Sequence, residues 1–207
     1  MKPRGPDKKG FAAAAVLFLA AGLGLWGIGH GLPFSYYPDE AHIVKRALSF
    51  GSGDLNPHWF HKPALYMYIV FGEYGILFLV GKVFGAWAGA TEFGVQFVRD
   101  PGVFYLIGRL STLLFALLTI AVVIRLGERH LRSGGGLMGG LLLALTAGLI
   151  ASSQHVKEDV PSMFFATLSL YWIMNYTASG RLHDLLVAAV AGGARTPTAM
   201  RSMPTAT

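Results

Sequence analysis

Long apolar runs dominate this chain and limit it to a membrane fold. They occupy residues 11–32, 63–86, 103–126, 137–153 and 160–175. A helix rises about 1.5 Å per residue, so a run of about 20 residues crosses a hydrocarbon core of about 30 Å. Hydrophobic residues make up 53% of the 207 residues and charged residues only 14%, too few to coat a soluble globule. The sequence therefore predicts an all-α fold, a polytopic transmembrane helix bundle.

Basic residues before the first apolar run indicate its orientation. They are Lys2, Arg4, Lys8 and Lys9. Positive charges flank transmembrane helices on the cytoplasmic side. The run 11–32 is too long for the apolar region of a cleaved signal peptide and lacks a small-residue cleavage site. We therefore expect residues 1–10 to form a basic, cytoplasmic N-terminus before an uncleaved anchor.

Basic residues further along the chain indicate that the run 63–86 does not cross the membrane. Arg125, Arg129 and Arg132 beside the third run, and Arg181 after the fifth, should be cytoplasmic. Runs three to five then cross in alternating directions, which leaves residues 34–102 outside as one block. The run 63–86 suits a helix in the outer leaflet because it contains Glu73, Lys82 and many aromatic residues. The alternative, a fifth true span, would put the two acidic loops on opposite faces.

Two short motifs match nucleotide-binding proteins but fail on their context. The letters "DEAH" at 39–42 occur in a helicase family, yet the chain has no phosphate loop of the G-x-x-x-x-G-K-[ST] type. The letters "GLGLWG" at 22–27 match G-x-G-x-x-G but lie inside an apolar run. The net charge of +6 is spread along the chain, so we expect no nucleic-acid partner. The absence of cysteine excludes disulfides and thiolate metal sites.

Two charged clusters are expected to meet outside the membrane. The first follows the anchor in "YYPDEAHIVKRALSF" and "HWFHKPAL", and the second is "HVKED" at 155–159. A carboxylate near a membrane surface suits a general base that takes a proton from an attacking hydroxyl. A lysine or arginine beside it can hold a phosphate. The charged residues concerned are Asp39, Glu40, Lys45, Arg46, His58, His61, Lys62, His155, Lys157, Glu158 and Asp159.

The same residues also have purely structural interpretations. Residues 39–50 have the pattern of an amphipathic interfacial helix whose charges are only solvated. Asp159, two residues before a proline, is a suitable helix N-cap. His58 and His61 could ligate a metal together with a carboxylate, although an H-x-x-H pair outside a helical i,i+4 arrangement is a weak signal. A divalent metal thus stays an open alternative, and the sequence identifies no cofactor with certainty.

Three motifs occur in order along the chain. They are the Asp-Glu pair in "YYPDEAH", the Lys-Pro junction in "HKPALYMYIV", and the acidic residue before Pro and Phe in "KEDVPSMFF". Together they resemble the N-terminal part of membrane glycosyltransferases of the GT-C type, over roughly residues 10–190. The nearest resemblance is to the lipid-carrier-dependent group that includes protein O-mannosyltransferases and aminoarabinose transferases. It implies sugar transfer from a polyprenyl phosphate, usually with inversion, at the outer face of the membrane.

The resemblance also implies roles for individual residues. Asp39 would act as the base or position the acceptor, Glu40 would support it, and Asp159 would line the same cavity. Lys62 would contact the donor phosphate, and Arg46 is a further candidate for that contact. The implied partners are a polyprenyl-phosphate sugar donor, membrane lipids, and an acceptor that is a protein, a lipid or a polysaccharide. The implied location is the bacterial inner membrane.

Composition divides the chain into three parts. After the N-terminus, residues 11–193 are expected to form the N-terminal part of a transmembrane glycosyltransferase domain. From Ala194 the sequence "ARTPTAMRSMPTAT" has no apolar periodicity, so residues 194–207 are expected to be an aberrant or disordered tail. A frameshift or a premature stop would produce such a tail, and a chain truncated there would lack part of the donor groove. A transporter or channel subunit and a non-catalytic membrane scaffold are the alternative functions.

Overall fold

The computed structural model describes residues 8–34, 37–59, 62–131 and 134–194. Residues 1–7 of the basic N-terminus and residues 195–207 of the predicted aberrant tail therefore lie outside the described residues. The described part is helical and contains no strand, which confirms the all-α fold class. Its α-helices are α1 (Lys8–Leu25), α2 (Pro38–Ser49), α3 (Ala64–Val83), α4 (Ala90–Arg99), α5 (Gly102–His130), α6 (Gly135–Ala144), α7 (Ala147–Ser153), α8 (Asp159–Ser179) and α9 (Leu182–Ala194). A short 3-10 helix, η1 (Phe50–Ser52), follows α2.

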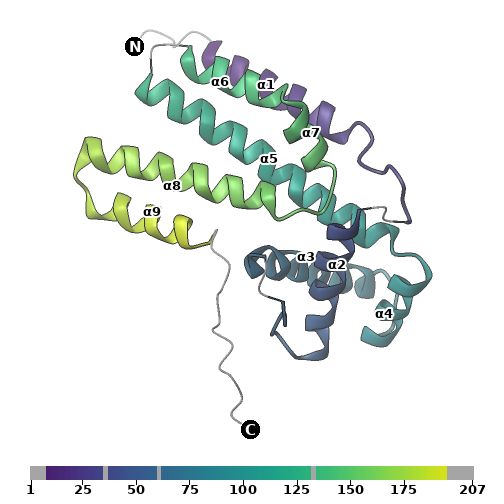
Figure 1. The fold of residues 1–207 in the computed structure, drawn as a ribbon. Helices are drawn as coiled ribbons and strands as arrows, with labels where there is room; N and C mark the ends of the chain where they lie inside the picture. Colours follow the sequence, from purple (N-terminus) through teal and green to yellow (C-terminus); the bar gives the residue numbers. More distant parts are fainter. Residues whose placement is uncertain (1–7, 35–36, 60–61, 132–133, 195–207) are drawn as a thin grey trace.

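The helix α5 is the centre of a bundle. It packs against α1, α6 and α8, and α8 also packs against α9 (Figure 1). Close packing of α5 on α6 depends on glycine, because a Cβ added to Gly136 would lie 2.1 Å from the carbonyl oxygen of Ile124. A larger residue there would push the two helices apart. The long helices thus form the membrane-type bundle that the apolar runs predict.

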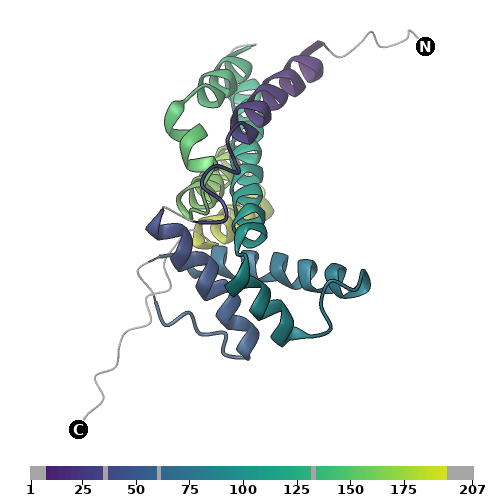
Figure 2. The same ribbon diagram turned by 90° about the vertical axis from the view of Figure 1, so that its right-hand side faces the viewer.

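The helices α2, α3 and α4 form a second layer at one end of this bundle. Figure 2 shows α3 lying crosswise to the axis of α5. The amphipathic helix α2 buries Ile43, Val44 and Ala47, whose i, i+1 and i+4 spacing places them on one face. This face packs on α3, where Met67 and Val70 are also buried. The interfacial helix predicted over 39–50 is therefore a packed helix of this layer.

Length and composition make three of the described helices candidates for crossing a membrane, namely α1, α3 and α5. The run 137–153, predicted as one span, is instead divided into α6 and α7, which are bent by 61° and form a broken span or a re-entrant pair. The helix α8 is not among the candidates, because polar residues in its second half, including Asn175 and Thr177, lower its hydropathy. The helix α3 is long and apolar enough to cross a membrane, and it lies crosswise to α5.

Candidate functional site

A buried ion pair fastens the start of α2 to α5. The side chain of Glu40 is 0% exposed, and Arg109 donates from Nε and Nη2 to its two carboxylate oxygens at 2.8 and 2.9 Å. The backbone N–H of Val156 donates to Oε1 of Glu40 at 2.8 Å. Arg109 Nη1 donates to the carbonyl oxygens of Ile28 and His30, both at 2.8 Å. Glu40 therefore joins α2, α5 and the segment before α8.

The neighbouring carboxylate, Asp39, belongs to a different cluster. The ammonium of Lys62 lies 3.0 Å from Oδ1 of Asp39 and 2.7 Å from Oε1 of Glu158. The side chains are 17% exposed for Lys62, 37% for Asp39 and 10% for Glu158, so the cluster opens to its surroundings on the Asp39 side. These contacts bring the two charged clusters of the sequence together.

Two opposing effects act on the pKa of Lys62. Partial burial lowers the pKa, but the hydrogen bonds to Glu158 and Asp39 outweigh burial, so the net pKa lies above the ordinary lysine value of 10.5. The ammonium is therefore charged at neutral pH. An ammonium has three N–H donors, and these two carboxylates use two of them. The third can donate to a phosphate oxygen.

Glu158, rather than Asp159, is the acid of the second cluster that faces Lys62. Its second carboxylate oxygen, Oε2, is buried without a hydrogen-bond partner among the described residues. The side chain of Asp159 is 64% exposed, and its Oδ2 lies 3.1 Å from the ammonium of Lys157. This contact raises the pKa of Lys157. Both acids were visible in the sequence, but their adjacent positions carried no signal of which one points inward.

The predicted capping role of Asp159 also differs from the structure. Glu158 occupies the N-cap position of α8, Asp159 is the first helical residue, and no side chain caps this end by a hydrogen bond. An acidic residue in the first turn still complements the positive end of the helix dipole.

Aromatic rings surround the Lys62 cluster. The ring of Tyr37 stacks on His155 with centroids 4.7 Å apart, and the ammonium of Lys157 lies 5.5 Å from the Tyr37 centroid. The ammonium of Lys62 lies 5.9 Å from the Trp59 ring. Sequence reasoning did not select Tyr37 or Trp59, although both flank the charged motifs and carry the flat apolar faces against which cations pack.

Arg46 lies beside the same tryptophan. Its guanidinium carbon is 4.9 Å from the Trp59 centroid, and its Nη1 donates to the carbonyl oxygen of Pro57. Its Nε is buried without a hydrogen-bond partner within the described part of the chain. Arg46 and Lys62 thus share one indole, so the structure brings both predicted phosphate-binding residues to one place.

The histidines considered for a metal site are differently placed. Nε2 of His58 lies 2.7 Å from Oδ2 of Asp54, and both side chains are exposed. His61 lies outside the described residues. Over residues 8–34, 37–59, 62–131 and 134–194, no group of three or more His, Cys, Asp or Glu is arranged to hold a metal ion.

Comparison with known proteins finds a family model that matches the second half of the chain. Residues 104–203 match the family model of dolichyl-phosphate-mannose-protein mannosyltransferases. The match confirms the resemblance to GT-C membrane glycosyltransferases. It spans just under half of the chain and includes Arg109 and Glu158, whereas Asp39 and Lys62 precede it. No curated protein and no solved structure matches the chain.

The family match and the fold agree on a general description. The family points to glycosyltransferase activity of the mannosyltransferase kind. The apolar helices of the bundle point to a multi-pass membrane protein. A glycosyltransferase of this family uses, in general terms, a lipid-phosphate-linked sugar donor and an acceptor.

Proposed function

We propose that this protein transfers a glycosyl group from a polyprenyl-phosphate-linked sugar to an acceptor hydroxyl at the outer face of the membrane. The single observation that carries the proposal is the ammonium of Lys62 held between Asp39 and Glu158. The family match supports the reaction class. The acceptor is a protein, a lipid or a polysaccharide, and the membrane is the bacterial inner membrane with the N-terminus in the cytoplasm.

The proposed reaction is a single displacement at the anomeric carbon. The acceptor oxygen forms a bond to this carbon while its proton passes to the carboxylate of Asp39. The bond between the anomeric carbon and the phosphate oxygen breaks, and its electron pair stays on the polyprenyl phosphate. The new bond forms opposite the one that breaks, so the configuration inverts.

Asp39 is the better base of the two adjacent carboxylates. A general base must reach the proton that it removes. The side chain of Asp39 is partly exposed, whereas both oxygens of Glu40 are engaged by Arg109 inside the protein. Glu40 therefore positions Asp39 by fixing the first turn of α2. Asp159 is exposed and pairs with Lys157, whereas Glu158 pairs with Lys62.

Lys62 is the proposed phosphate-binding residue. Charge develops on the phosphate as the glycosyl bond breaks, and a cation placed there stabilises that charge. The third N–H of the ammonium supplies this contact while the other two keep Asp39 and Glu158 in position. Arg46, on the same indole, adds a second positive charge nearby.

The decisive experiment compares two Asp-to-Asn variants. Membranes that contain the native chain, Asp39→Asn or Asp54→Asn are supplied with polyprenyl phosphates carrying radiolabelled mannose or aminoarabinose, and label in protein, lipid and polysaccharide is counted. Asp54 is the matched control because it is exposed and pairs with His58 away from Lys62. We expect Asp39→Asn to lose about 10²- to 10⁴-fold in rate, as removal of a general base does, and Asp54→Asn to keep native activity.

Two outcomes would contradict the proposal. One is full activity of the Asp39→Asn variant at equal protein level, which would remove this carboxylate from the reaction. The other is the absence of transfer from either donor by the native chain. A protein that instead moved the labelled donor across the bilayer without transfer would support the transporter alternative.

A further inference from the structure

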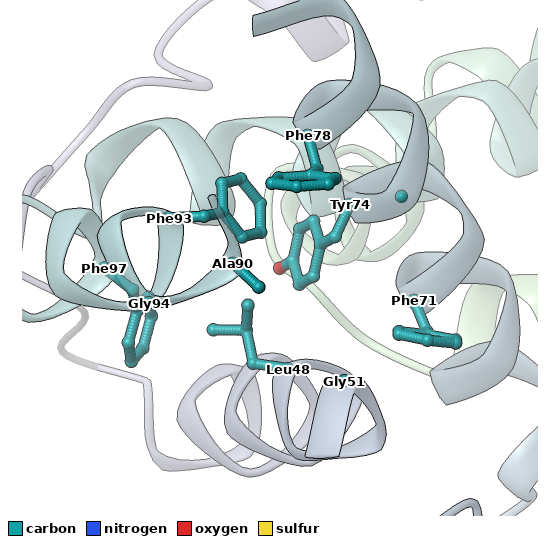
Figure 3. Close-up of a pocket in the computed structure, with 10 residues that line it drawn as sticks. Leu48, Gly51, Phe71, Tyr74, Phe78, Ala90, Phe93, Gly94 and Phe97 are labelled. Atoms are coloured by element: carbon teal, nitrogen blue, oxygen red, sulfur yellow. The ribbon is translucent and has the colours of Figure 1, made fainter. Parts of the chain in front are cut away.

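The structure contains an apolar pocket apart from the Lys62 cluster. It has a volume of about 400 Å³ and lies between the C-terminal end of α2 with η1, the helix α3 and the helix α4 (Figure 3). Ligand pockets typically measure roughly 300–1,000 Å³. Leu48 lines the pocket near the end of α2, whereas Asp39 is at the start of that helix, roughly 13 Å away along an axis that rises about 1.5 Å per residue.

The lining of this pocket is mainly apolar. It is built mainly from the rings of Phe71, Tyr74, Phe78, Phe93 and Phe97. The hydroxyl of Tyr74 donates to the carbonyl oxygen of Phe104 at 3.0 Å and is thereby used inside the protein. A polar group brought into such a lining would lose its hydrogen bonds to water without replacement. The chemistry of the pocket therefore selects a hydrocarbon.

Two helical glycines line the pocket. Gly75 lines it from α3 and Gly94 from α4, and a Cβ added to either would meet no atom within 4 Å. Neither has the positive φ that requires glycine. A glycine inside a helix costs roughly 1 kcal/mol relative to alanine. Both positions therefore have room for a larger side chain.

The surface around the pocket indicates which apolar ligand is available to it. The helix α3 is apolar enough to lie in a membrane. Large apolar side chains are exposed on both flanking helices, namely Ile76, Leu79 and Val83 on α3, Phe84 directly after it, and Val95 and Val98 on α4. Such a surface favours lipid over water. A lipid chain is therefore the apolar ligand available to this layer.

A cation lies beside the pocket. The ammonium of Lys82 is 6.0 Å from the centroid of the Phe78 ring, which lines the pocket. Within the described part of the chain, Lys82 forms no ion pair. A lysine at a membrane surface attracts the phosphates of anionic lipids. We propose that the pocket binds one acyl chain of an anionic membrane phospholipid, whose phosphate contacts Lys82. This site is independent of the proposed glycosyl transfer.

Photo-crosslinking in vesicles tests the site directly. The full chain is reconstituted into phosphatidylcholine vesicles that contain a trace of phosphatidylglycerol with a diazirine on one acyl chain. After illumination, labelled peptides are mapped by mass spectrometry. We expect adducts on the segments that contain Phe71, Phe78 and Phe93. The same diazirine chain on phosphatidylcholine should label these segments less, because its headgroup has no net charge.

Two pairs of variants separate a specific site from general contact with lipid. Gly75→Leu fills the pocket, whereas Gly72→Leu adds the same side chain on α3 at an open position that does not line it. We expect Gly75→Leu alone to reduce labelling to background. Lys82→Gln should lower phosphatidylglycerol labelling about five-fold, the effect of losing one surface cation. The control Lys45→Gln removes an exposed lysine from α2 and should leave phosphatidylglycerol labelling unchanged.

Three labelling results would contradict the proposal. Equal labelling of the Gly75→Leu and Gly72→Leu variants would show lipid contact without a pocket. Equal labelling by the phosphatidylglycerol and phosphatidylcholine probes would show that Lys82 does not select an anionic headgroup. Displacement of the label by unlabelled polyprenyl phosphate, but not by unlabelled phosphatidylglycerol, would assign the pocket to an isoprenoid chain and overturn the phospholipid assignment.

Discussion

Arg109 and Glu40, 69 residues apart in the sequence, form an ion pair with two hydrogen bonds that is almost completely buried. Successive residues of a helix point in different directions. The first turn of α2 therefore sends Glu40 into the protein toward Arg109 and sends Asp39 toward Lys62. The position of Asp39, the proposed base, thus depends on the Arg109–Glu40 ion pair, which is buried inside the protein.

Removal of one partner from this pair should destabilise the protein strongly. In Arg109→Met the carboxylate of Glu40 stays buried without its cation, which costs roughly 3–5 kcal/mol for a buried pair. We expect a marked fall in the midpoint of thermal unfolding in detergent. Arg129→Met, at the exposed end of the same helix, is the control and should unfold like the native chain. Equal midpoints for the two variants would show that the buried pair contributes little.

Glu158 and Asp159 should differ in their effect on glycosyl transfer. Glu158→Gln removes the charge that pairs with Lys62, a hydrogen bond to a charged group worth roughly 1.5–3 kcal/mol. We expect an increase of about 10- to 100-fold in the KM for the donor, because the ammonium is no longer held in place. Asp159→Asn should leave KM and kcat close to native, since its partner Lys157 is a separate contact. A larger kinetic effect of Asp159→Asn than of Glu158→Gln would show that Asp159, and not Glu158, belongs to the site.

The contribution of Lys62 to stability should persist into alkaline solution. Its folded-state pKa lies above 10.5, so its pairing is fully present below pH 10.5 and is lost as the pH rises through the higher folded value. The difference in unfolding midpoint between the native chain and Lys62→Met should therefore be constant from about pH 7 to 10 and shrink above that. A difference that disappears by about pH 9 would contradict the raised pKa.

Single cysteines should show which loops share a face of the membrane. The chain has no cysteine of its own, so a membrane-impermeant thiol reagent gives no background. Ser52→Cys and Asp159→Cys, both at exposed positions, should react in intact cells, and Arg129→Cys only after permeabilisation. Asp159 serves better than Ser153 for this purpose because Ser153 is buried. Reaction of Asp159→Cys only from inside would mean that the two charged loops do not share the outer face.

The sequence by itself determined the class of fold and suggested the family that it resembles. Apolar runs long enough to cross a membrane leave few alternatives to helices, because every backbone polar group in lipid needs an internal partner. The order of three motifs was sufficient to suggest a GT-C glycosyltransferase, which the family match confirms. The alternation of apolar and charged residues in the sequence indicated an amphipathic helix over residues 39–50. The observed helix, Pro38–Ser49, is close to that range.

The tertiary structure alone decided which charged residues meet. Asp39 and Glu40 are adjacent in the sequence, as are Glu158 and Asp159. Helical spacing puts Glu40 on the same face as Ile43, Val44 and Ala47, but no local pattern tells which partner each acid meets. That choice depends on Arg109 and Lys62, which other helices and loops bring into contact. The aromatic pocket between α2, α3 and α4 was equally invisible in the sequence, because it is a space left where three helices pack and not a property of any one of them.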